Sequence, residues 1–139
     1  MNDILKLARI QILIIILFAF FKFIRPPVLE SKSYEWIKIT LLSLPNFFEG
    51  ILGVLILTGM GLYLNDRLRG SLKRIKPDYI YIIALVFAAI YVITQEFKLH
   101  NLGGNNVYDV NDVIFSIIGL GVGYLIVLAK KPVIQETSE

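Results

Sequence analysis

Two apolar runs around one polar loop decide the fold: YIYIIALVFAAIYVITQE (residues 79–96), FKLHNLGGNNVYDVND (97–112) and VIFSIIGLGVGYLIVLA (113–129). Each run has about the length of a helix that crosses a bilayer, which needs roughly 20 predominantly apolar residues. Acidic residues stand where the first run ends and the second begins. Such acids cost free energy at the mouths of membrane helices unless they are solvated, paired or used, so they are candidates for a functional site.

The rest of the chain has the same character. Hydrophobic residues make up 56% of the 139 residues, and the mean hydropathy is +0.70. We therefore expect an all-α integral membrane protein with one domain over residues 1–139. It should be a four-transmembrane-helix bundle whose partner is the lipid bilayer. The expected spans are about 5–24, 46–64, 79–95 and 113–129.

Prolines suggest where helices begin and end. Pro26 and Pro27 follow the first apolar run and are expected to end its helix. Pro45 is expected in the first turn of the second span, where a missing amide costs nothing. Between them, Tyr34 to Leu44 could form a short helix on the membrane surface.

Basic residues predict the direction of the spans. The loop between spans two and three contains Arg67, Arg69, Lys73, Arg74 and Lys76, whereas the next loop contains only Lys98. The positive-inside rule then gives cytoplasmic N and C termini, with loops one and three outside. The first loop is an exception, because Lys22, Arg25, Lys32 and Lys38 would face outward. The net charge of +3 is explained by topology, and no nucleic-acid partner is expected.

This topology brings acidic residues at the ends of three expected helices to the outer membrane interface. Neighbouring helix axes in a small bundle lie roughly 8–10 Å apart, so these side chains could share one polar site. The candidate residues are Glu96, Asp109, Asp112, Glu49, Asn46 and His100. Carboxylates favour hard cations such as Mg²⁺ or Ca²⁺, which makes Glu96, Asp109 and Asp112 the candidate ligands of a divalent metal.

Each acid also has a plainer explanation. Asp109 and Asp112 share one helix face and could simply cap the last span. Glu96 could simply lie in the headgroup region, because its span ends there. Glu49 could stand outside a span that starts later than expected.

The other candidates are open in the same way. Asn46, beside Pro45, could belong to a turn, and His100 could be a solvated loop residue that does no chemistry. Gly119 and Gly123 form a small-xxx-small pair, which is typical of helix packing either within one chain or in a homo-oligomer. The chain has no cysteine, so disulfides and thiolate metal sites are excluded.

The order of these motifs resembles the VanZ-like membrane proteins over roughly residues 44–128. The matching elements are Glu96, a polar loop, Asp109 and Asp112, Gly119 in the last span, and Leu44-Pro45-Asn46-Phe47 at the start of the second. Departures are Leu99, Asn106 and Ser116, which stand where Gln, Arg and Asn are common, and Glu49, near where many members have His.

The resemblance implies a bacterial envelope protein, an accessory factor linked to glycopeptide tolerance. Its outward acidic site would bind a cation or the headgroup of a lipid or cell-wall precursor. One alternative is an integral-membrane enzyme that acts on a lipid-linked substrate through the carboxylates and a divalent metal. Another is a small ion or proton transporter, although few ionisable residues lie deep in the expected spans.

Overall fold

The chain folds into a bundle of long helices. The computed structural model describes residues 2–32, 34–71, 73–97 and 110–134. Its elements are α1 (Asn2–Glu30), α2 (Glu35–Arg67), the short 3-10 helix η1 (Leu68–Gly70), α3 (Pro77–Glu96) and α4 (Val110–Lys130). All four α-helices are long and apolar enough to cross a membrane. The prediction of an all-α, multi-pass membrane protein with four potential spans is confirmed.

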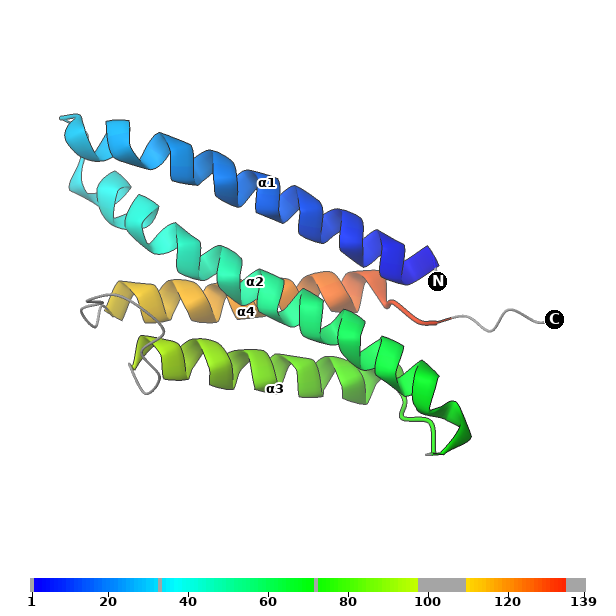
Figure 1. The fold of residues 1–139 in the computed structure, drawn as a ribbon. Coiled ribbons are helices and arrows are strands. Elements are labelled where there is room, and N and C mark those ends of the chain that lie inside the picture. The colour runs from blue at the N-terminus through cyan, green and yellow to red at the C-terminus, as the bar shows by residue number, and fades with distance from the viewer. Residues whose placement is uncertain (1, 33, 72, 98–109, 135–139) are drawn as a thin grey trace.

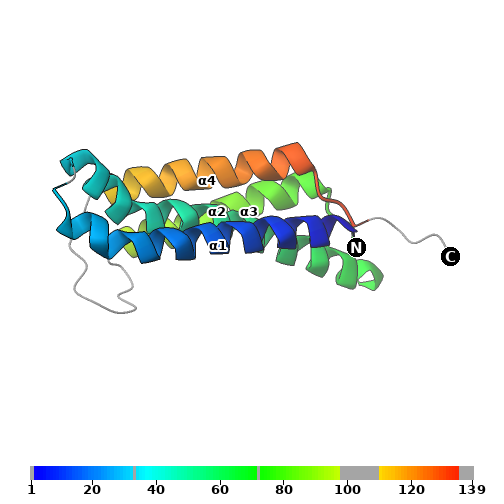
Figure 2. The same cartoon turned by 90° about the horizontal axis from the view of Figure 1, so that it is seen from above.

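Helix α2 lies at the centre of the bundle (Figure 1). It packs most extensively against α4, then against α3 and then against α1. The N terminus and the end of α4 lie together at what we call the termini end. The α1–α2 connection, the end of α3 and the start of α4 lie at the opposite end, the far end, as the second view also shows (Figure 2). The start of α1 and the end of α4 therefore share one end, as the predicted topology requires.

Glycines let α2 and α4 approach closely as parallel helices. A Cβ added to Gly50 would lie 2.8 Å from the carbonyl oxygen of Ser116, and one on Gly123 would lie 3.1 Å from the α2 backbone. A Cβ on Gly119 would overlap the carbonyl oxygen of Phe47. Lipid provides no hydrophobic force between helices, so close packing of small residues stabilises such contacts. We call this contact between α2 and α4, through Gly50, Gly119 and Gly123, the α2–α4 seam. Gly119 and Gly123 are thus buried against α2, which supports the alternative of packing within one chain, and a homo-oligomer through them stays a prediction.

Helix α3 runs antiparallel to α2. A Cβ on Gly53 would lie 3.5 Å from Cβ of Ala88, and one on Gly61 would approach the side chain of Ile80. Counting outward from Gly53 and Ala88, the last residue of α3 is level with Pro45 of α2. The part of α2 before Pro45 therefore extends beyond α3 at the far end.

Prolines do not end the helices as predicted. α1 continues through Pro26 and Pro27, and Pro45 lies inside α2. The predicted ends at these prolines and the separate surface helix over Tyr34 to Leu44 are wrong. A proline leaves the carbonyl four residues earlier without its helical donor. The affected carbonyl of Leu41 lies beyond the end of α3, where water and headgroups can replace the lost bond.

The lengths of the helices fit this placement. α1 and α2 have 29 and 33 residues, and α3 and α4 have 20 and 21. At 1.5 Å per residue the first two measure about 44 and 50 Å, against roughly 30 Å of hydrocarbon core. The α1–α2 hairpin must therefore project into the headgroup region or tilt strongly.

The segment after α4 closes the termini end. The buried hydroxyl of Tyr81 donates a 2.7 Å hydrogen bond to the carbonyl oxygen of Pro132. The amide of Val133 donates to the carboxylate of Asp3 at 3.2 Å, and Arg74 donates to the carbonyl of the next residue at 3.4 Å. Three parts of the chain, α1, the α2–α3 connection and α3, thus hold this segment.

Candidate polar site at the far end of the bundle

A layer of polar side chains crosses α2, α3 and α4 near the far end. The contacts of Gly53 with Ala88 and of Gly119 with Phe47 set the register of the three helices. Within about three helical turns along the bundle axis, this register places the residues that we call the polar layer, which are Ser43, Asn46, Glu49, Gln95, Asp112 and Ser116. Its level is within about two turns of the end of α3, close to where the membrane interface is expected.

Glu49 and Gln95 form the central pair of the layer. Gln95 lies on the face of α3 that meets α2, two turns beyond Ala88, and its side chain hydrogen-bonds to that of Glu49. Because a carboxylate only accepts hydrogen bonds, the Gln95 amide group must be the donor. Gln95 Oε1 is buried and has no hydrogen-bond partner among the described residues. Such an unsatisfied acceptor costs about 1–3 kcal/mol.

Two serines add further unsatisfied atoms. Ser116 is fully buried on α4 against Gly50, and Ser43 lies two turns before Gly50 on the same face of α2. The Oγ atoms of both serines lack a hydrogen-bond partner in the described part of the chain. Most buried polar side chains in proteins find a partner, so several exceptions in one layer need an explanation such as a ligand or water.

The predicted candidates in α2 have clear positions. Glu49 lies well inside α2 and is half-buried, and the alternative that the membrane span itself starts after Glu49 stays a prediction. Asn46 is also helical, and its assignment to a turn is wrong. Both residues belong to the polar layer because α2 begins as early as Glu35.

Of the other predicted site residues, the structure describes the positions of Asp112 and Glu96. Asp112 lies in the first turn of α4, one turn before Ser116 and about two turns before Gly119, which places it beyond the end of α3. Glu96 is the last residue of α3, is half-buried and has a polar partner. Asp109 and His100 lie outside the described residues.

The described residues contain no group of acidic or histidine side chains arranged to hold a metal ion. Within residues 2–32, 34–71, 73–97 and 110–134, no three His, Cys, Asp or Glu side chains gather in a way that could hold a metal ion. The predicted metal site of Glu96, Asp109 and Asp112 includes a residue outside these ranges and stays a prediction.

Sequence reasoning missed Gln95, Ser43 and Ser116 as site residues. A signal was present for Gln95. Ala84, Ala88 and Val92 recur at spacings of four and are all buried, and Gln95 continues that face into the same contact with α2. The serines gave no comparable signal, because their environment depends on which helix covers them.

Comparisons with known proteins add no further assignment. Searches of protein-family models, of curated proteins and of solved structures found no match to this chain. The chemistry of the site must therefore be argued from its own residues.

Proposed function

We propose that this multi-pass membrane protein binds a cationic, amine-bearing headgroup at the polar layer, on the outer side of the membrane. The observation that carries the proposal is the Glu49–Gln95 pair, in which a half-buried carboxylate sits beside a buried carbonyl oxygen with no donor. A donor-rich cation would satisfy both acceptors at once.

The atoms of the layer favour an ammonium group over a divalent metal. An ammonium has three donors and needs one negative charge with neutral acceptors around it. Glu49 supplies the charge and Gln95 Oε1 a neutral acceptor. A divalent metal would need six or more oxygen ligands, usually with several carboxylates among them. No such cluster is found among the described residues.

The wider role that fits this proposal is that of an accessory factor in a bacterial envelope. It rests on the resemblance to the VanZ-like proteins and on the predicted topology, with the far end outside. Amines occur on lipid headgroups and on cell-wall precursors, so a factor that holds them could alter tolerance of glycopeptide antibiotics.

Ligand-induced stabilisation tests the proposal directly. The full chain is purified in detergent, and its thermal unfolding is followed with ethanolamine, with Mg²⁺ or with neither. A ligand that binds only the folded state at 100 times its Kd adds about 2.7 kcal/mol to stability. We expect ethanolamine to raise the unfolding temperature and Mg²⁺ to have a much smaller effect.

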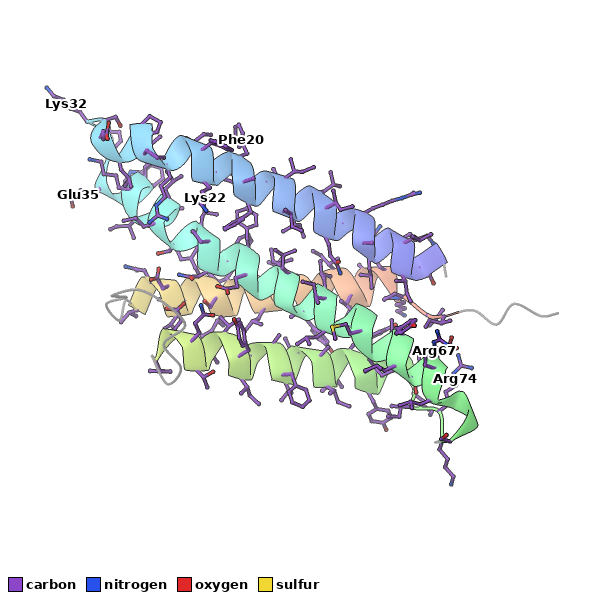
Figure 3. The ribbon with its side chains drawn as sticks, in the orientation of Figure 1. Phe20, Lys22, Lys32, Glu35, Arg67 and Arg74 are labelled. Carbon is purple, nitrogen blue, oxygen red and sulfur yellow. The ribbon has the colours of Figure 1, made fainter. Side chains whose placement is uncertain are left out.

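Glu49→Gln is the test variant, and Glu35→Gln is its matched control. Both remove one carboxylate from α2, but Glu35 is exposed at the start of the helix, where Figure 3 shows it pointing away from the bundle. We expect E49Q to lose the ethanolamine response and E35Q to keep it. Equal responses of both variants, or no response of the wild type, would overturn the proposal.

A cellular experiment tests the wider role. A deletion strain is compared with strains that carry the wild type, E49Q or E35Q at equal membrane abundance. The proposal predicts altered glycopeptide sensitivity on deletion, restored by the wild type and by E35Q but not by E49Q. Restoration by E49Q would show that the carboxylate has no part in the phenotype.

A further inference from the structure

A hollow opens between α1 and α2 at the far end, on the side of α2 away from the polar layer. Its volume is about 220 Å³. Phe18 and Phe21 of α1 and Phe48 of α2 line its apolar part, with ring centroids 6.0 and 5.9 Å apart across the two helices. The hollow is thus a mainly aromatic groove between two membrane helices.

Two basic side chains border the same hollow. Lys22 and Arg25 both line it and stand three residues apart on one face of α1. Figure 3 shows Lys22 extending from α1 toward α2, whereas Phe20 points away from the bundle. Neither basic side chain forms an ion pair with any residue in the described ranges. Their positive charge is available to a ligand.

The depth of the hollow suits a lipid headgroup. Leu41 and Pro45 of α2 also line it, and Pro45 is level with the end of α3. The basic rim and the aromatic floor therefore span the boundary between headgroups and acyl chains. Since α1 packs chiefly against α2 and leaves most of its apolar surface exposed, lipid can reach the hollow from the side.

Lys22 and Arg25 are also exceptions to the positive-inside rule that the rest of the chain follows. Under the predicted topology they lie on the outer side, where the positive-inside rule disfavours lysine and arginine. A bound anion would explain why two of them stand at this rim. Phosphate is the anion that membrane lipids carry at this depth, and Arg and Lys are its usual partners.

We propose that the α1–α2 hollow binds an anionic phospholipid. Its phosphate lies between Lys22 and Arg25, and the first part of an acyl chain lies against Phe18, Phe21 and Phe48. This site is separate from the polar layer and does not depend on the proposed function, because it uses different side chains on a different face of α2.

Native mass spectrometry of the delipidated full chain in detergent tests the site. Phosphatidylglycerol is titrated in parallel with phosphatidylcholine of the same acyl chains. We expect one phosphatidylglycerol to bind in preference to phosphatidylcholine. In the double variant K22Q/R25Q, that binding should weaken by about 25-fold, since each basic residue near an anionic headgroup contributes about fivefold.

The matched control is K32Q/K38Q, which removes two lysines from the same end of α1 and α2 without touching the hollow. A second variant, Leu44→Phe, narrows the hollow but keeps both charges, and it should also weaken binding. Circular dichroism checks that each variant is folded. If K22Q/R25Q fails to fold, Leu44→Phe decides the question.

Four results of the titrations would overturn the proposal, and a fifth would come from the mass of the protein itself. They are equal binding of the two lipids by the wild type, equal losses in the two double variants, unchanged binding by folded Leu44→Phe, and displacement of the lipid by millimolar inorganic phosphate. The last would indicate a free-anion site. A dimer that closes the hollow and excludes lipid would appear as a doubled mass and would also refute the proposal.

Discussion

The α2–α4 seam makes a sharp prediction for Gly119→Ala. A Cβ at this position overlaps the carbonyl of Phe47, which is helix backbone and cannot turn aside as a flexible side chain would. The two helices must therefore separate locally. We expect the variant to be less stable than the wild type, although alanine is the better helix former.

The size of the effect follows from the packing. Restoring ordinary contact at the Phe47 carbonyl requires a shift of about 1 Å, and a gap of that size forfeits a quarter to a half of each dispersion contact of about 0.1–0.2 kcal/mol. Over about 20–30 atom pairs along the contact between α2 and α4, the loss is about 0.5–3 kcal/mol. Alanine regains about 0.5–1 kcal/mol through its helix propensity. Taking the middle of each range, the expected net loss of unfolding free energy is about 1 kcal/mol.

Gly121→Ala is the control for this prediction. Gly121 lies in the same helix two residues on, and a Cβ there meets nothing within 4 Å. This variant should match the wild type or exceed it by up to about 1 kcal/mol. Unfolding of both purified variants is measured by circular dichroism during titration with a denaturing detergent. If G119A is as stable as G121A, the close approach of α2 and α4 at Gly119 does not exist.

Three further substitutions test other contacts. Tyr81→Phe removes the buried hydrogen bond to the carbonyl of Pro132, so it should cost about 1–3 kcal/mol and expose the segment after α4 to proteases, as timed digestion would show. Asn65→Ala removes two hydrogen bonds to the backbone of Ile75, at 2.9 and 3.1 Å, and should speed tryptic cleavage of the α2–α3 connection; an unchanged cleavage rate would contradict it. Thr58→Val replaces a fully buried hydroxyl with no hydrogen-bond partner among the described residues, so thermal unfolding should show a gain of up to about 2 kcal/mol rather than a loss.

Hydrophobic run length was enough to predict the number and order of the helices. It was not enough to predict their ends, because the prolines suggested local breaks that tertiary packing and solvation override. The side chains of Leu41 and Ser43 are buried, which favours continuing α2 through Pro45. Propensity describes an isolated helix, whereas these ends are set by what covers each turn.

The candidate site was predictable in part. Charge bias placed Glu49 on the same side of the membrane as the end of α3, and the structure brings it to Gln95 of that helix. The charge bias could not reveal which uncharged residues complete the polar layer. Ser43 and Ser116 matter only because Gly50 lets α4 come close enough to bury them. That information lies in the register between two helices, which composition does not contain.

The middle of α2 links the two proposed sites. Phe48 and Glu49 are consecutive and therefore point about 100° apart on the helix, so one faces the hollow beside α1 and the other faces α3. A positively charged rim and a negatively charged pair thus lie at one depth on two sides of one helix. Since the sites share no side chain, any thermodynamic coupling between their ligands would have to arise from a shift of α2 itself. The seam of Gly50 and Gly119, where the backbones are in contact, leaves little room for such a shift, which argues for two independent sites.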